Sequence, residues 1–214
     1  MSNVQRPCGW RRCFGSRTAS PAIQTAMERV LVLVALVGAR YAHARSDWTY
    51  RTTMPGTTDC AMAFDSARGV AVCLAGYPNT SITMEWGGAA WTERAASPHP
   101  SIRFGHVMAY DTDRHVTVLF GGSDDVSRLN DTWEWDGIRW SLRAISGPSP
   151  REYSAMVYDP DRHLTVLFGG NVSDSADGIV GETWEWNGAV WTKRTGVEPS
   201  PRVLHSMVYD ADRR

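Results

Sequence analysis

One pattern recurs along the chain and limits the folds that it can adopt. Two clear copies begin at His106 and Ser154, and each runs through a polar turn and an apolar stretch to a Gly-Gly pair. Each copy then continues, after a loop, with Trp-Glu-Trp and one further Trp. This last Trp recurs at intervals of 43 to 51 residues, at Trp48, Trp91, Trp140 and Trp191. Such a period is typical of small units that pack side by side, and it makes the tryptophans structural before anything else.

Two further copies depart from the pattern or are partial. The copy that begins at Cys60 has Ala75 in place of the first Gly of the pair and Met84 in place of the first Trp. A fourth copy begins at His205 and reaches Arg213. Residues 48–51 match the end of a unit that has no beginning in this sequence.

Each unit is predicted to form four short strands. In residues 106–110 the larger side chains of His106, Met108 and Tyr110 alternate with Val107 and Ala109, a period of two. Residues 116–120 are largely β-branched and apolar. Between them lies Asp-Thr-Asp-Arg, a polar turn. Residues 132–135 and 140–143 flank an Asp-Gly hairpin turn and form the third and fourth strands. No segment after residue 45 has a helical period, so we expect an all-β protein.

Four-stranded units at this spacing bury their faces by packing around an axis, as propeller blades do. The Gly-Gly pair after a β-branched strand, followed by an aromatic strand, a turn and a Trp, resembles the kelch repeat of β-propellers. The Trp-Glu-Trp-Asp-Gly variant is similar to kelch-like repeats of exported bacterial proteins. The resemblance covers residues 48–214. It implies a partial kelch-type propeller with about three complete blades and flanking strands.

The number of blades predicts an incomplete ring. Propellers close with about four to eight blades, whereas this sequence supplies three units, a fourth strand at 48–51 and a first strand at 205–209. Propellers of the resembling family often complete one blade from both termini, but the second and third strands of that blade are absent here. We therefore expect a partial gene product or half of an assembly, completed by additional blades from further sequence or by self-association.

Residues 1–44 are predicted to be a secretory signal region, which leaves 45–214 as the propeller body. Ten apolar residues at 30–39 follow Arg29 and precede Ala42-His43-Ala44, so we expect cleavage after Ala44. Translation from Met27 would give a signal of ordinary proportions. The alternative is a short buried helix or strand. No apolar run is long enough to span a membrane, and we expect a secreted, periplasmic or cell-surface protein.

Charge argues against nucleic acid as a partner. Residues 1–44 hold six of the 22 Lys and Arg and one of the 23 Asp and Glu, which leaves 16 basic and 22 acidic residues in 45–214. An acidic body has no electrostatic footprint for nucleic acid or an anionic membrane. Lys193 is the only lysine, and this preference for Arg indicates a GC-rich, bacterial genome.

Cys60 and Cys73 fall on the first two strands of the first unit. A register that pairs Phe64 with Gly69 places them opposite each other, and an exported protein can keep the resulting disulfide. The alternative is two buried thiols. Cys8 and Cys13 leave with the signal. We expect no metal or cofactor, because there is no CxxC pair and the position of His106 and His205 holds Cys60 and Ser154 in the other units.

Three arginines precede the first strand by three residues in successive units: Arg103, Arg151 and Arg202. Around one mouth of a central channel they could bind carboxylates, and propellers that this chain resembles hold acidic peptides at such positions. The alternative is a hydrogen bond from each Arg to a backbone carbonyl of a neighbouring unit. A second set, in the first turn of each unit, is expected to brace that turn: Arg68, Arg114, Arg162 and Arg213.

The loops after each Gly pair vary most, at 77–82, 123–131 and 171–182. Variable loops on constant strands favour a role in recognition. The sequence therefore predicts a non-catalytic exported scaffold that binds a protein or carbohydrate ligand. The alternative is a fragment of a kelch-type extracellular enzyme, similar to the copper-dependent sugar oxidases, whose catalytic residues are absent here. No catalytic residue is assigned.

Overall fold

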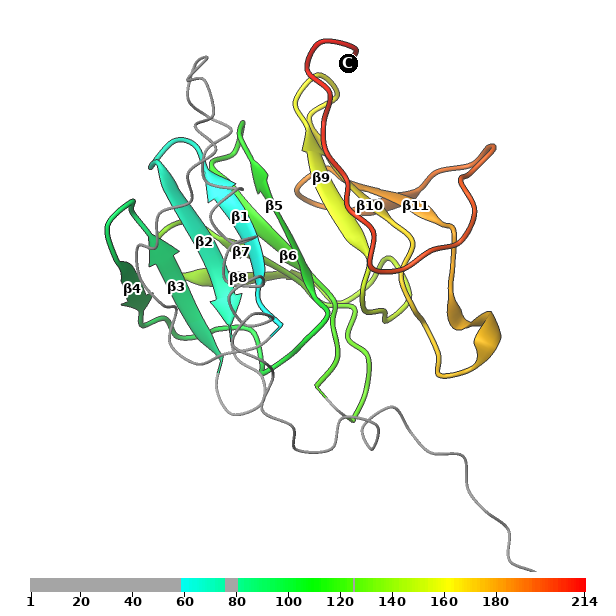
Figure 1. Cartoon of the computed structure of the whole chain (residues 1–214), viewed down its shortest axis with the longest axis horizontal. Helices are drawn as coiled ribbons and strands as arrows, with labels where there is room; N and C mark the ends of the chain where they lie inside the picture. The colour runs from blue at the N-terminus through cyan, green and yellow to red at the C-terminus, as the bar shows by residue number, and fades with distance from the viewer. Residues whose placement is uncertain (1–58, 76–80, 125) are drawn as a thin grey trace, which may run out of the picture. The chain divides into compact units, whose positions relative to one another are not determined.

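The computed structural model describes residues 59–75, 81–124 and 126–214, and this part of the chain is all-β (Figure 1). It contains three four-stranded antiparallel sheets, one 3-10 turn (η3, Ala176–Gly178) and no α-helix. The predicted signal region 1–44, its cleavage site at Ala44 and the predicted strand at 48–51 lie outside the described residues.

Each repeat unit forms one sheet, and in each sheet the strands lie side by side in chain order. The first sheet contains β1 (Ala61–Asp65), β2 (Val70–Ala75), β3 (Ile82–Trp86) and β4 (Trp91–Arg94). The second contains β5 (Val107–Asp111), β6 (Val116–Phe120), β7 (Thr132–Trp135) and β8 (Trp140–Ala144). The third contains β9 (Ala155–Asp159), β10 (Leu164–Phe168), β11 (Thr183–Trp186) and β12 (Trp191–Lys193). The strands predicted for the second unit agree to within one residue at each end.

Antiparallel order puts the connections at two opposite ends of every sheet. The tight turns after the first and third strands share one end, which we call the turn end. The loops after the second strand and the links between units share the other, which we call the loop end. At the turn end Asp111 Oδ1 accepts hydrogen bonds from the backbone N–H groups of Asp113 and Arg114, and Arg114 Nε donates to Asp111 Oδ2 at 2.8 Å. The predicted bracing of the first turn by Arg is confirmed here.

Successive sheets pack against each other, with β1 next to β5 and β5 next to β9 (Figure 1). The middle sheet is buried on both faces because its side chains alternate. Met108 and Leu119 face Val72 and Leu74 of the first sheet, whereas Val118 and Phe120 face Leu167 of the third. This alternation is the period of two that the sequence shows.

The register of the first hairpin differs from the prediction. Phe64 pairs with Ala71 rather than with Gly69, and Asp65 pairs with Val70. The reason is that Asp65 stays in the strand while its carboxylate accepts the N–H groups of Ala67 and Arg68, and Gly69 N–H donates to Asp65 C=O. Cys60 is therefore diagonal to Cys73, whose direct partner is Met62. The structure joins the two cysteines in a disulfide, with Cα atoms 6.3 Å apart.

The strand predicted at 205–209 does not form, which corrects the sequence analysis. No second strand pairs with this segment in the described part of the chain. It nevertheless lies beside the third unit, because Tyr209 Oη donates to Asp161 Oδ2 at 2.5 Å. The following turn forms as in the other units, with Asp210 Oδ1 accepting the N–H groups of Asp212 and Arg213.

Candidate functional site

The loop between the second and third strands is clamped at both ends by a buried arginine. In the second unit Arg103 is 1% exposed, and its Nη1 donates to Gly121 C=O at 3.0 Å, just before the loop. The same guanidinium donates to both carboxylate oxygens of Asp131, at 2.6 and 2.8 Å, where the loop ends. Burial pushes the pKa of Asp131 up, but the hydrogen bonds from Arg103 outweigh it and hold this pKa below its usual range.

The third unit repeats the clamp with a different acid. Arg151, also 1% exposed, donates to Gly169 C=O at 3.1 Å and to Glu182 Oε2 at 2.7 Å. Against the effect of burial, hydrogen bonds from Arg151 and Lys193 lower the pKa of Glu182 to about 2. The predicted hydrogen bond to a carbonyl is therefore present, but the acceptor belongs to the arginine's own unit. This geometry favours a loop-positioning role for Arg103 and Arg151.

Arg202 differs from the other two predicted arginines because it is exposed. Its Nε donates to Ser200 C=O at 3.0 Å and its Nη2 to Ser200 Oγ at 2.9 Å. The guanidinium carbon lies 5.9 Å from the centre of the Phe168 ring. Within the described residues it forms no ion pair, so of the three it is the one with capacity for a ligand.

Arg128 joins the two described loops. It extends from loop 123–131, where its backbone pairs with Ser123, and its Nη2 donates to Glu152 Oε1 at 3.0 Å and also to Asp174 in the next loop. Glu152 is 7% exposed, and burial raises its pKa above the usual range against the opposing charge of Arg128. We call loops 123–131 and 171–182 together with Glu152 the loop surface.

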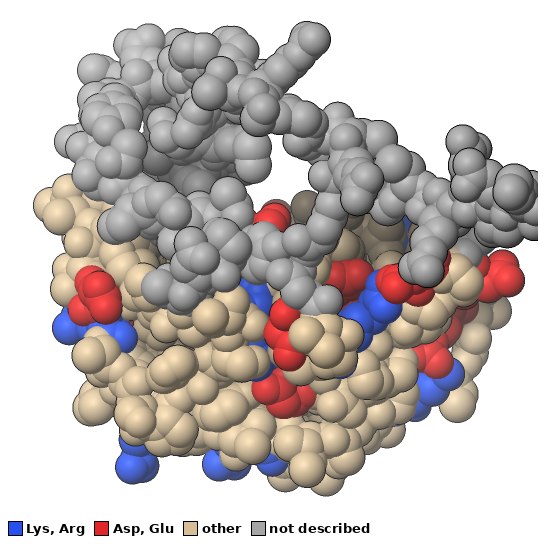
Figure 2. All heavy atoms as spheres, turned by 90° about the horizontal axis from the view of Figure 1, so that it is seen from below, with Lys and Arg blue, Asp and Glu red and all other residues tan. Residues whose placement is uncertain are grey.

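The loop surface carries charges of both signs. Asp174 and Val126 are exposed, Val126 to 92%, whereas Asp124 is half-buried. Figure 2 views the molecule from below in Figure 1 and shows Asp and Glu beside Lys and Arg rather than a patch of one sign. Such a surface offers donors, acceptors and one apolar contact, but no field that would attract a polyanion.

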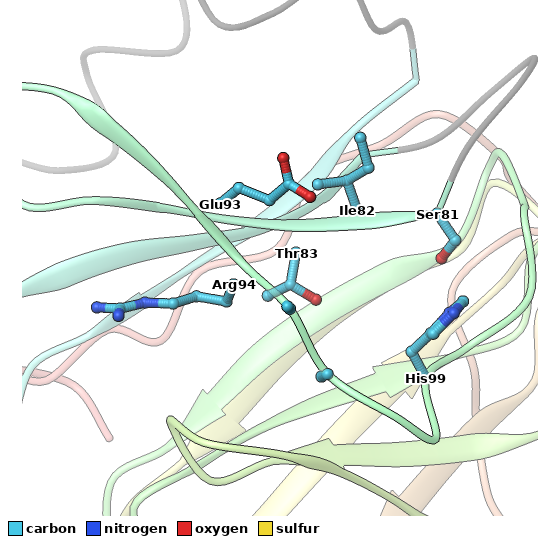
Figure 3. A pocket seen from close by; sticks show the side chains of 8 residues that line it. Ser81, Ile82, Thr83, Glu93, Arg94 and His99 are labelled. Carbon is cyan, nitrogen blue, oxygen red and sulfur yellow. The ribbon is translucent and has the colours of Figure 1, made fainter.

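A small hollow lies beside the first sheet, with a volume of about 200 Å³ (Figure 3). Its lining includes Ser81, Thr83, Glu93 and His99. Ser81 Oγ donates to Pro100 C=O at 2.7 Å, and His99 Nδ1 lies 2.8 Å from the same oxygen. Because the hydroxyl and the ring nitrogen share this backbone oxygen, they do not form a nucleophile and base pair.

The histidines of the repeat lie among apolar groups. His106 is 6% exposed, and burial lowers its pKa to about 3, so the ring is neutral at ordinary pH. His205 packs edge-on against Phe168, with ring centres 5.4 Å apart. Among the described residues no group of three His, Cys, Asp or Glu side chains is close enough to hold a metal ion.

Comparison of the chain with models of known protein families finds no match. In the described part of the chain no helix is long and apolar enough to cross a membrane. The function must therefore be inferred from the geometry.

Sequence reasoning missed Arg128, Asp131 and Glu182 as site residues. Arg128 is the only basic residue in loops 123–131 and 171–182, which was a usable signal. Asp131 and Glu182 occupy the same place, one residue before Thr-Trp-Glu-Trp, and an acid at equal repeat positions indicates a shared partner.

Proposed function

We propose that the protein is an exported, non-catalytic kelch-type propeller scaffold that binds a protein or carbohydrate through its loop surface. The observation that carries this proposal is the pair of arginine clamps. Equivalent contacts from Arg103 and Arg151, to a carbonyl before each loop and an acid after it, hold two loops that differ in length and sequence. A constant clamp under variable loops is the arrangement expected where the loops determine what is bound.

The Gly pairs support the propeller part of the proposal. A Cβ added to Gly121 would lie 2.7 Å from Arg151 C=O, and one added to Gly169 would lie 2.5 Å from Arg202 C=O. The link into each following unit therefore passes directly over the Gly pair of the preceding one, and Gly122 N–H donates to Arg151 C=O at 2.9 Å. Only glycine allows this approach, which is a reason for the doublet in the repeat.

The disulfide supports export, because disulfides persist in oxidising compartments and are rare in the cytosol. Cys60 and Cys73 are bonded in the first unit. Together with the signal expected in residues 1–44, this favours a secreted, periplasmic or cell-surface location. Mass spectrometry of the exported protein without reduction tests both points, since it reads the start of the chain and the two missing thiol hydrogens.

Binding rather than catalysis fits the charged groups of the loop surface. Arg103, Arg151 and Arg128 each have a carboxylate partner within the scaffold. These ion pairs fix the loops, while Val126 and Asp177 remain exposed for contact with a partner.

The experiment is a screen of the purified protein on glycan and peptide arrays, followed by affinity measurements on two variants. Replacing Val126 and Asp177 by Ala should weaken binding of the selected ligand by about tenfold or more. The matched control replaces Ile138 and Arg139, exposed at the turn end, by Ala and should leave binding unchanged. Equal losses in both variants contradict the proposal. Stoichiometric copper with sugar oxidation would instead support the enzyme alternative.

A further inference from the structure

Neighbouring sheets are joined by a contact set that occurs twice. Between the first and second sheets, Trp135 Nε1 donates to Glu85 Oε1 at 3.1 Å and Trp140 Nε1 donates to Thr83 Oγ1 at 2.7 Å. Between the second and third sheets, Trp186 Nε1 donates to Glu134 Oε1 at 3.0 Å and Trp191 Nε1 donates to Thr132 Oγ1 at 2.8 Å. Each unit thus presents two indole donors to the unit before it and two acceptors to the unit after it.

The turn between the third and fourth strands belongs to the same contact set. A Cβ added to Gly137 would lie 2.9 Å from the guanidinium carbon of Arg68, and one added to Gly188 would lie 2.9 Å from that of Arg114. The turn of each unit therefore lies directly on the first-turn arginine of the unit before it.

The third sheet presents the acceptor half of this set without a donor. Glu185 and Thr183 correspond to Glu134 and Thr132, and in the described residues no tryptophan reaches them. The Glu185 side chain is 16% exposed, against 2% for Glu85 and 7% for Glu134. Arg162, which would receive the turn, is 42% exposed, against 31% for Arg114.

Among the described residues, the first sheet presents the donor half without an acceptor. The ring centres of Trp86 and Trp91 are 5.7 Å apart, close to the 5.5 Å of Trp135 and Trp140 in the paired interface. The indole pair is therefore already arranged for docking. Gly88 has φ +95, like Gly137 at +93, but no heavy atom of the described part of the chain lies within 4 Å of a Cβ added to it.

We propose that the first sheet of a second copy of this chain docks on the third sheet, head to tail. In this contact Trp86 of one copy donates to Glu185 of the other, and Trp91 donates to Thr183. The turn at Gly88 then lies on Arg162. The occupant is a second copy because the described part of one molecule carries both unpaired halves of an interface that it forms twice internally. The contact joins unlike faces, so repetition builds a ring or a chain of molecules.

Residues 205–210 must move aside for this docking. They lie where the first strand of a following unit belongs, since Tyr209 contacts Asp161 of the preceding first turn. The segment has no strand partner among the described residues and Val208 is 86% exposed. Moving it gives up the ring contact of His205 with Phe168 and the Tyr209 hydrogen bond, whereas the incoming β1 brings a complete sheet with it.

The test is sedimentation equilibrium of the full chain over a wide concentration range, with two single-face variants. W86F/W91F removes both indole donors and keeps aromatic rings, and T183V/E185A removes the two acceptors. Wild type should self-associate, and each variant alone should associate about 10- to 100-fold more weakly. I145A, at an exposed position in the link after β8 and outside the contact set, is the matched control and should behave as wild type.

Mixing the two variants gives the decisive result. Their remaining faces are complementary, so the mixture should form a dimer with wild-type affinity and grow no further. A wild type that stays monomeric at every concentration overturns the proposal, and so does a mixture no stronger than either variant alone. If W86F/W91F fails to fold, T183V/E185A still decides, because unchanged association in that variant also overturns the proposal.

Discussion

The second and third sheets contain the same four residues, Thr-Trp-Glu-Trp, in two different environments. Thr132 and Glu134 in β7 are buried beneath Trp191 and Trp186 of the third sheet. Thr183 and Glu185 in β11 are half-buried, and their partners among the described residues lie in their own unit and in the link that follows it. The Thr and Glu side chains of this strand therefore owe their burial to the neighbouring unit. The same substitution at equivalent positions of two units should therefore change the free energy of unfolding by different amounts.

Truncation of a tryptophan should show the largest difference between a paired and an open sheet. Trp186 is 1% exposed in the interface between the second and third sheets, so Trp186→Ala should lower the free energy of unfolding by about 3–5 kcal/mol. Trp86 is the equivalent residue of the first sheet and is only half-buried, so Trp86→Ala should cost about 1–2 kcal/mol. Urea denaturation at low protein concentration measures both. Equal losses would mean that the paired interface contributes no more than the sheet itself.

Replacing a glutamate by glutamine tests the same interface by removing one negative charge. Glu134 accepts from Trp186 and Arg114 while 7% exposed, so Glu134→Gln should destabilise the protein by about 2–3 kcal/mol. Glu185 pairs with Arg162 and with Arg194, which is 52% exposed. Glu185→Gln should therefore cost about 0.5 kcal/mol. A larger loss at Glu185 than at Glu134, in the same denaturation assay, would contradict the assignment of the open face.

Substitutions at two glycines distinguish the cost of backbone strain from the cost of disturbing the contact between units. Gly188 and Gly88 have φ of +92 and +95, so an Ala at either position carries a similar strain of about 1 kcal/mol. Only at Gly188 would the new Cβ meet another unit, 2.8 Å from Arg114 Nη1. Gly188→Ala should thus cost about 1 kcal/mol more than Gly88→Ala. Thermal unfolding of the two variants side by side measures this difference, and equal melting temperatures would remove the turn from the contact set.

The strands of each unit could be predicted from the sequence, whereas the contacts between units could not. Alternation and turn residues located β5 to β8 to within one residue, because both signals are local. The predicted register of the first hairpin was wrong by two residues, because the register depends on which backbone N–H groups the Asp65 carboxylate accepts. Trp135 and Glu85 are 50 positions apart, and nothing local to either residue indicates the other. The acid partners of Arg103 and Arg151 were missed for the same reason.

The smallest effect is the pH dependence of the arginine clamp. The pKa of Glu182 is lowered to about 2 in the folded protein, below the 4.3 or so of an unfolded glutamate. A depressed folded pKa gives stability that is complete above the unfolded pKa and is lost as the pH falls through the folded value. Wild type should therefore lose stability between about pH 4.5 and 2, and Glu182→Gln should lose less over that window. Parallel stability curves for the two proteins would show that the charge of Glu182 does not hold loop 171–182. Since Glu152 has a raised pKa, Glu152→Gln should not flatten the curve in the same way.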